Sequence, residues 1–235
     1  MKISKLLGLS LAGILALSPV LESCDWNNDD DQANSMALVT VKVNTDKTIW
    51  GLTDENDKIY FNPSSGIITS YKATDGQRAI IYFNALSEKI SGYDYNADVR
   101  GIQDILTKEI KKVTTAAQDT LGDDAVNIVK AWIGGGYLNV QLNFYTSGTV
   151  THVINVEDNQ LNASAEEKDD NYVNLELRHN KNKDPYDRGT LATAYVCFKL
   201  GDYNPATLGK KGINLRYAPL SGEAHSYIKV AISSK

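Results

Sequence analysis

Tyr137-Leu138-Asn139-Val140-Gln141-Leu142-Asn143-Phe144 is the stretch from which the fold class follows. Leucine, valine and phenylalanine fill every second position, and asparagine or glutamine lies between them. This period of two is typical of a β-strand that has one face on a core and the other in water. The stretch therefore predicts a sheet protein.

The same alternation recurs downstream, over residues 150–156, 173–179, 192–200, 213–217 and 228–232. Turn-forming Gly, Asn, Asp and Pro residues separate these stretches, as expected between antiparallel strands. Six such strands predict an antiparallel β-sandwich over residues 137–235.

Upstream, residues 37–118 predict a second β domain. Alternation over residues 37–43 indicates one strand, and the polar turn at residues 54–57 joins two others into a hairpin. Residues 97–117 fit either an amphipathic helix or a long strand that runs to about residue 110.

Residues 119–136 are expected to link the two domains and to contain a short helix from Ala125 to Ile133. An aspartate just before this segment could cap the helix, and the glycine run Gly134-Gly135-Gly136 could end it and act as a hinge.

The first 23 residues are interpreted as a lipoprotein signal peptide. Lys2 and Lys5 precede a run of twelve residues, 6–17, that is apolar apart from glycine and serine. That run is short of the roughly 20 residues needed to span a membrane. Leu21-Glu22-Ser23-Cys24 resembles a lipobox, so we expect Cys24 to be acylated and to insert into membrane lipid. A plain secretory signal, with Cys24 an incidental thiol, is the alternative.

Residues 24–36 are expected to form an acidic tether. Asp29, Asp30 and Asp31 follow an earlier Asp25, and like charges keep such a segment extended and solvated. The run also resembles the export signal of surface-exposed lipoproteins in Bacteroidetes. It therefore predicts an outer-membrane protein that is displayed at the cell surface.

Several segments resemble the NigD-like lipoproteins of Bacteroidetes, most specifically Gly135-Gly136-Tyr137-Leu138-Asn139 and Leu175-Glu176-Leu177-Arg178-His179-Asn180. The resemblance implies an all-β fold, with an N-terminal OB-like five-stranded barrel followed by the β-sandwich. It also favours the strand over residues 97–110. The family name comes from a bacteriocin gene cluster, which suggests an immunity or accessory role, and no catalytic residues can be carried over.

Charge and cysteine content exclude several classes of protein. The net charge of −5 is unlike that of a nucleic-acid-binding domain, which needs clustered Lys and Arg. Two cysteines provide no disulfide framework, and Cys197 is expected to be a packing residue in a strand. No cofactor-binding motif or catalytic constellation is present in the sequence.

His152 and His179 each lie on the apolar face of an expected strand. They could be two ligands of a metal, but a zinc site needs three or four ligands and the spacing supplies no third. We expect both to be core histidines whose rings are hydrogen-bonded within the protein, and no metal site is predicted. Glu176 and Arg178 are expected to form an outward-facing surface ion pair.

The OB-like domain offers the best candidate binding surface, because such barrels bind oligosaccharides or oligonucleotides across strands two and three. Trp50 and Tyr60 lie on those strands and are candidate ligand contacts, although aromatic residues in a small barrel also serve as core. Asp119-Thr120-Leu121 resembles a Bacteroidetes O-glycosylation sequence, which makes Thr120 a candidate modification site.

Three functions remain open from the sequence. The first is a non-enzymatic lipoprotein that binds a glycan or a protein partner. The second is a bacteriocin-immunity or envelope-defence factor. The third, a hydrolase with a loop-built site, is disfavoured because no catalytic motif accompanies it.

Overall fold

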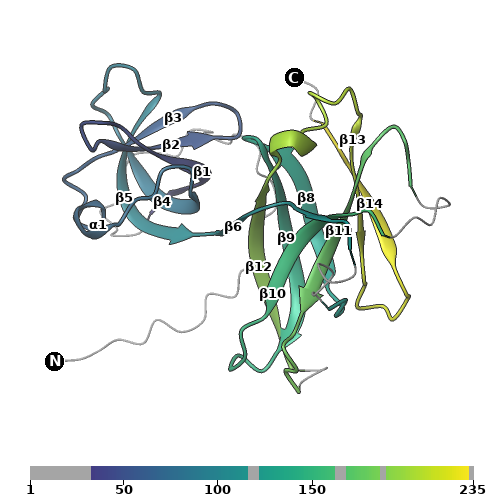
Figure 1. Cartoon of the computed structure of the whole chain (residues 1–235). Coiled ribbons are helices and arrows are strands. Elements are labelled where there is room, and N and C mark those ends of the chain that lie inside the picture. Colours follow the sequence, from purple (N-terminus) through teal and green to yellow (C-terminus); the bar gives the residue numbers. More distant parts are fainter. Residues whose placement is uncertain (1–32, 116–121, 162–167, 186–188, 233–235) are drawn as a thin grey trace. The chain divides into compact units, whose positions relative to one another are not determined.

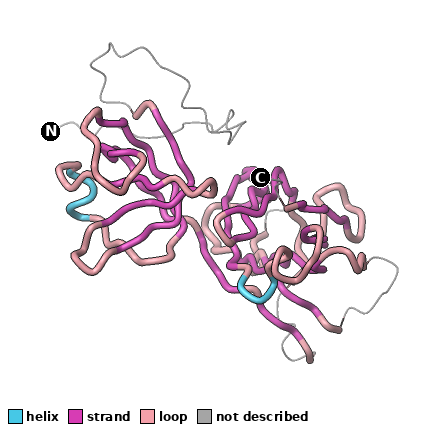
Figure 2. The backbone as a smooth tube through the Cα atoms, turned by 90° about the horizontal axis from the view of Figure 1, so that it is seen from above, coloured by secondary structure: helices cyan, strands magenta, loops and turns pink. Residues whose placement is uncertain are grey.

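The computed structural model describes residues 33–115, 122–161, 168–185 and 189–232. β-Strands form nearly all of its regular structure, and the helical elements are the short α1 (Gly66–Ser70) and the 3-10 turn η1 (Gly201–Tyr203). Figure 2 shows the strands in magenta and these turns in cyan. Within the described residues, no helix is long and apolar enough to cross a membrane. The all-β prediction is confirmed.

Five strands close the N-terminal barrel in the order β1-β2-β3-β5-β4 (Figure 1). They are β1 (Ser35–Val43), β2 (Ile49–Thr53), β3 (Lys58–Phe61), β4 (Arg78–Leu86) and β5 (Tyr95–Asp104). Helix α1 lies between β3 and β4 in the chain, as in an OB fold. The prediction of an OB-like five-stranded barrel is confirmed.

The barrel core consists of the inward residues of each strand, among them Val39, Ile59, Phe61, Ile81 and Val99. One inward position on β2 is a glycine, because a Cβ on Gly51 would lie only 2.9 Å from Val39 Cβ. The barrel can therefore close tightly between β1 and β2.

The C-terminal part is a sandwich of two sheets, ordered β14-β13-β11-β10-β7 and β6-β12-β9-β8. Its strands are β6 (Leu106–Glu109), β7 (Lys111–Val113), β8 (Asn127–Gly134), β9 (Tyr137–Thr146), β10 (Val153–Asn159), β11 (Val173–Asn180), β12 (Thr190–Lys199), β13 (Gly212–Tyr217) and β14 (Ser226–Ala231). Buried side chains from both sheets meet between them, including Leu142, Val156, Leu177, Phe198 and Leu215. Most pairings are antiparallel, and β6, β7 and β13 each add one parallel pairing.

The expected helix from Ala125 to Ile133 is wrong, because strand β8 occupies this segment and pairs with β9. A bulge between Ile128 and Lys130 shifts the register. It leaves Ile128, Ala131 and Ile133 on the core side, and this spacing of three and two obscures the period of two in the sequence. The expected glycine hinge is a hairpin turn, in which Gly135 and Gly136 have φ of 59° and 85°.

The long strand expected through about residue 110 is interrupted. Strand β5 ends at Asp104, and β6 and β7 pair with sandwich strands β12 and β10 (Figure 1). The sandwich therefore begins at Leu106, earlier than the expected start at residue 137. A fragment of residues 137–235 would lack β6, β7 and β8, which all pair with sandwich strands.

A buried arginine joins the barrel to the sandwich. Arg78, at the start of β4, is 0% exposed and forms an ion pair of 2.8 Å with Asp54 in the β2–β3 turn. Its guanidinium also donates to Thr40 Oγ1 at 3.1 Å and to Asn139 Oδ1 at 3.2 Å. The same group lies 5.0 Å from the ring centroid of Tyr137.

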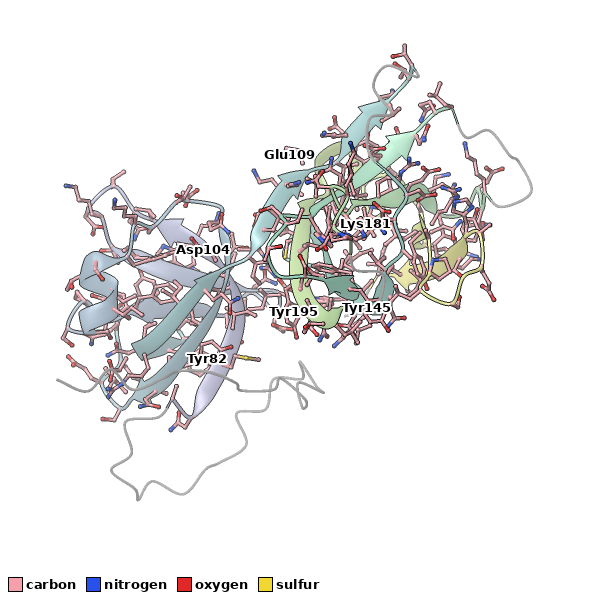
Figure 3. The ribbon with its side chains drawn as sticks, turned by 90° about the horizontal axis from the view of Figure 1, so that it is seen from below. Tyr82, Asp104, Glu109, Tyr145, Lys181 and Tyr195 are labelled. Carbon is pink, nitrogen blue, oxygen red and sulfur yellow. The ribbon has the colours of Figure 1, made fainter. Side chains whose placement is uncertain are left out.

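The residues around Arg78 allow the β8–β9 turn of the sandwich to lie against Asp54 of the barrel. Cβ atoms added to Gly134 and Gly135 would lie 2.4 Å and 2.6 Å from carboxylate oxygens of Asp54, so only glycine lets the β8–β9 turn approach. Trp132 Nε1–H donates to Asp54 Oδ2 at 3.1 Å. A small apolar cluster surrounds the polar centre, formed by Leu38, Ile80, Ile105, Tyr137 and Cys197, with Tyr82 and Tyr195 (labelled in Figure 3) packed against it.

We predict that Asp54→Ala lowers the free energy of unfolding by about 3 kcal/mol, because it leaves the buried Arg78 charge without its carboxylate. Arg78→Met added to the same chain should recover part of that loss, since both charges are then gone. Urea denaturation followed by circular dichroism measures both effects.

Asp57→Ala is the matched control in the same turn and should change stability by less than about 0.5 kcal/mol. Equal stability of the Asp54 and Asp57 variants would contradict the importance of the Arg78–Asp54 pair.

Candidate functional site

Trp50 and Tyr60 lie side by side on the outside of the barrel. They are directly opposite one another in the β2–β3 pairing. Tyr60 points outward because its neighbours in β3, Ile59 and Phe61, point into the core. Both rings are half-buried. The candidate contact residues are thus on the surface side of the barrel, and their role in binding stays a prediction.

A third ring comes from the loop between β4 and β5. The ring centroid of Tyr93 lies 5.9 Å from that of Trp50 and 5.2 Å from that of Tyr60, with interplanar angles of 72° and 56°. Edge-to-face and tilted contacts of this kind stabilise aromatic groups. We call Trp50, Tyr60 and Tyr93 the aromatic face.

Asn44, in the β1–β2 turn, fixes two of these rings. Its side-chain oxygen accepts a hydrogen bond from Trp50 Nε1 at 2.9 Å, and its side-chain nitrogen donates to the Tyr93 hydroxyl at 3.2 Å. The aromatic face is therefore held from β2, β3 and both adjoining loops, the same elements with which OB folds bind their ligands. Neither Asn44 nor Tyr93 was singled out from the sequence, because only the closed barrel brings the two loops together.

A polar pocket of about 470 Å³ beside α1 is a second candidate site on the barrel. It is lined by Ser65, Asp98 and Arg100, among others. Asp98 is already paired with Arg100 at 2.8 Å and accepts a hydrogen bond from Ser65 Oγ at 2.8 Å. Its charged groups therefore satisfy one another, and the aromatic face is the stronger candidate.

The two histidines of the sandwich contact each other. His152 Nδ1 lies 2.9 Å from His179 Nε2, and His152 Nε2 lies 3.0 Å from Asp184 Oδ2. His179 Nδ1 lies 3.3 Å from the carbonyl oxygen of Asp124. The ring of Phe144 packs against both imidazoles. All four ring nitrogens thus have a partner within the protein.

The chain of contacts from Asp184 through both imidazoles to Asp124 needs more N–H hydrogens than two neutral rings carry. It has an acceptor at each end, so three N–H hydrogens are needed on four ring nitrogens, and two neutral imidazoles supply only two. With both imidazoles neutral, two of the three contacts are therefore hydrogen bonds. The Asp184 carboxylate also accepts a hydrogen bond from the backbone N–H of Ser147 at 2.8 Å.

The surroundings of His179 disfavour its protonation. Burial and then the neighbouring His152 lower the pKa of His179 below its ordinary value of 6.5. Together with the occupied ring nitrogens, this supports a structural role for the pair, and no group of three metal-ligating side chains occurs among the residues that the structure describes.

Glu176 and Arg178 are not the exposed surface pair that was expected. Their side chains are 9% and 10% exposed and lie 3.2 Å apart. Glu176 also pairs with Arg216 at 3.4 Å and accepts a hydrogen bond from Asn159. The difference arises because β13 places Arg216 directly beside Glu176 in the sheet, a pairing that strand periodicity cannot reveal.

Cys197 lies in the junction near Arg78. Burial raises the pKa of its thiol to about 11, although the nearby Arg78 acts in the opposite direction. Its Sγ contacts Asn139 Oδ1 at 3.1 Å. The thiol is thus protonated and enclosed, which fits the packing role expected of it.

The remaining candidates, Cys24, Asp29, Asp30, Asp31 and Thr120, lie outside the described residues. The lipidation, export and glycosylation hypotheses for them stay predictions.

The order of a five-stranded OB barrel followed by a β-sandwich defines a class of two-domain all-β proteins. The chain belongs to the NigD-like family. The NigD-like N-terminal OB domain matches residues 38–105, and the NigD-like C-terminal beta sandwich domain matches residues 109–230. These matches confirm the resemblance found in the sequence.

Solved structures of similar proteins come from Bacteroides and Parabacteroides species. A protein of unknown function from Bacteroides vulgatus has a TM-score of 0.71 at 24% identity, over 85% of this chain and 91% of that one. A protein from Parabacteroides distasonis, provisionally described as toxin-related, has a TM-score of 0.64 at 28% identity, over 84% and 93%. A NigD-like immunity protein from Bacteroides caccae has a TM-score of 0.60 at 25% identity, over 82% and 91%. A comparison with curated proteins found no match.

We predict that acidification destabilises the sandwich through His179. Because its folded-state pKa is lowered, unfolding takes up a proton once the pH falls below the unfolded value of 6.5. The stabilising contribution is thus present above that pH and is lost as the pH falls toward the folded pKa, at up to about 1.4 kcal/mol per pH unit.

Thermal unfolding between about pH 7.5 and pH 5 tests this prediction. The Tm of the wild type should fall more steeply than that of His179→Gln, which carries no titratable ring. Parallel pH profiles of the two proteins would show that His179 does not contribute.

Proposed function

We propose that the protein is a lipid-anchored, non-enzymatic binding protein whose OB barrel holds a glycan on the aromatic face. The observation that carries the proposal is the convergence of Trp50, Tyr60 and Tyr93 on the outer face of β2 and β3. Aromatic rings present an apolar surface on which sugar rings can stack, and their polar edges can still reach water.

The way the rings are held supports a preformed site. Asn44 uses both ends of its amide on Trp50 and Tyr93, so their rotamers are fixed before any ligand arrives. A site that is already ordered loses less conformational entropy when it binds. Core aromatic residues of a barrel would instead be enclosed, as Phe61 is at 1% exposed.

The absence of enzymatic activity is supported by the state of the reactive groups. The described histidines 152 and 179 bond to each other and to the protein, and Cys197 is a buried thiol with a raised pKa. Enzymes usually display perturbed groups in an open cleft. Of the similar structures named above, one is described as a NigD-like immunity protein and one as toxin-related, and neither description names an enzyme activity.

We predict that Trp50→Ala removes most of the glycan affinity, because each stacking ring lost weakens binding by about 1 kcal/mol or more. The full-length protein, purified in detergent, would be applied to an immobilised panel of polysaccharides and the bound protein measured. The matched control is Tyr145→Ala, which removes a half-buried aromatic ring from strand β9 of the sandwich instead. Retention of all glycans by the Trp50 variant would contradict the proposed site.

We also predict that Cys24→Ala releases the protein from the membrane. The motivation is the lipobox-like tetrad after an apolar run that is too short to span a bilayer. Cell fractionation should recover the variant in soluble fractions or as an unprocessed chain. Normal processing and outer-membrane partition of Cys24→Ala would place the anchor elsewhere.

Surface display is tested in the same cells. Protease added to intact cells should degrade the wild type and spare a variant in which Asp29, Asp30 and Asp31 are replaced by alanine. Equal protection of both proteins would argue against the export signal.

A second candidate function is bacteriocin immunity, favoured by the Bacteroides caccae structure, which is described as a NigD-like immunity protein and is 25% identical to this chain. Deletion of the gene should then sensitise cells to a bacteriocin, and a Trp50→Ala copy should restore resistance if the aromatic face is not involved. Sensitivity that is unchanged by deletion would favour the glycan-binding role.

A further inference from the structure

Two lysines border the aromatic face. Lys42 of β1 is the direct cross-strand neighbour of Trp50. Lys58 lies two residues before Tyr60 on β3, which places both side chains on the same outward side of the strand. The Lys58 ammonium nitrogen lies 5.9 Å from the centroid of the Trp50 ring.

Within the part of the chain that the structure describes, these two ammonium groups have no carboxylate partner. Among the described residues, no carboxylate lies within 4.0 Å of either one. Other lysines of the protein are engaged: Lys199 pairs with Glu109 at 2.8 Å and Lys229 with Asp169 at 2.7 Å. Lys108 donates to Asn155 at 2.8 Å.

Two acidic residues near the face use their carboxylates to hold the backbone. Asp46 accepts from the backbone N–H of Thr48 at 2.9 Å, and Asp94 accepts from the backbone N–H of Lys58 at 2.7 Å. These carboxylates fix the turns that present the aromatic face and keep their negative charge. Lys42 and Lys58 offer the ammonium groups beside the rings, in a chain whose net charge is −5.

We propose that the ligand of the aromatic face is an acidic glycan, whose sugar rings stack on Trp50 and Tyr60 while its carboxylate or sulfate groups pair with Lys42 and Lys58. This inference rests on the proposed glycan-binding function and names the class of sugar. Lys58 is exposed and its contact with the Trp50 ring is a weak cation–π interaction. The ammonium can therefore leave the ring for a carboxylate, with which it forms a stronger charge-assisted hydrogen bond.

The spacing of the four groups fits an extended chain better than a single sugar. Lys42, Trp50 and Tyr60 follow one another across three adjacent strands, and neighbouring strands lie about 4.8 Å apart. A row of about 10 Å is thus available, with Lys58 at its side. A polymer with a charge on successive sugar units can contact both lysines and both rings at once.

Polygalacturonate and its fully methyl-esterified form test the inference. The two polymers share one backbone, and esterification replaces each carboxylate with a neutral methyl ester. The full-length protein in detergent should bind the free acid at least tenfold more tightly by isothermal titration calorimetry. Raising NaCl from 50 mM to 300 mM should remove most of this preference, because salt screens the lysine charges.

Variants that remove one lysine charge test whether the preference for the free acid comes from Lys42 and Lys58. Lys42→Gln and Lys58→Gln should each weaken binding of the free acid severalfold and leave binding of the ester unchanged. Lys112→Gln, on the exposed strand β7 of the sandwich, is the control and should change neither. Circular dichroism of each variant confirms that the fold is retained.

The outcomes separate the inference from the function on which it rests. Equal affinity for the acid and the ester overturns the acidic class and leaves glycan binding intact. Failure of the wild type to bind either polymer, or any acidic or neutral member of the panel above, overturns both. Tighter binding of single-stranded oligonucleotides through the same lysines would overturn the inference in favour of a nucleic acid.

Discussion

The guanidinium group of Arg78 is enclosed by protein on all sides, and the barrel and the sandwich both contribute to its shell. Moving such a charge out of water is costly unless a carboxylate and further acceptors surround it. This constraint accounts for several features at once: Asp54 in the β2–β3 turn, the asparagine on β9, and the glycines that let the β8–β9 turn come close. Asp54 neutralises the buried cation, Asn139 accepts a hydrogen bond from it, and the glycines make room for the contact.

The same constraint reaches the proposed ligand site through β1. Thr40, which accepts from Arg78, and Lys42, which borders the aromatic face, are two residues apart on the same outward side of that strand. Across from them, Leu52 and Trp50 follow the same order on β2. The junction and the aromatic face therefore share one surface of the barrel, and the rigidity that Arg78 gives to β1 also fixes one edge of the binding surface.

Much of the fold was accessible from the sequence, because half-buried strands leave a period of two that can be counted. The prediction failed where the period was broken. The bulge in β8 broke the alternation of Ile128, Ala131 and Ile133, so the aspartate before the segment and the glycines after it were taken as the ends of a helix. The sandwich strands β6 and β7 are too short to show a pattern of their own. The candidate site was predictable to the same extent. Trp50 and Tyr60 lie on strands that the sequence reveals, whereas Asn44 and Tyr93 lie on loops and were not predicted. The pairing of His152 with His179 also depends on register, which the sequence does not specify.

Because the thiol of Cys197 is buried, the protein is suited to site-specific labelling at a cysteine introduced elsewhere. With a pKa of about 11, roughly one molecule in ten thousand carries the reactive thiolate at neutral pH. Burial among the junction side chains further shields it from reagents. In a chain whose Cys24 is acylated or replaced, a cysteine introduced on an exposed turn would therefore react selectively with a maleimide fluorophore. Distances between the barrel and its surroundings on a living cell could then be followed without removing any native residue from the fold.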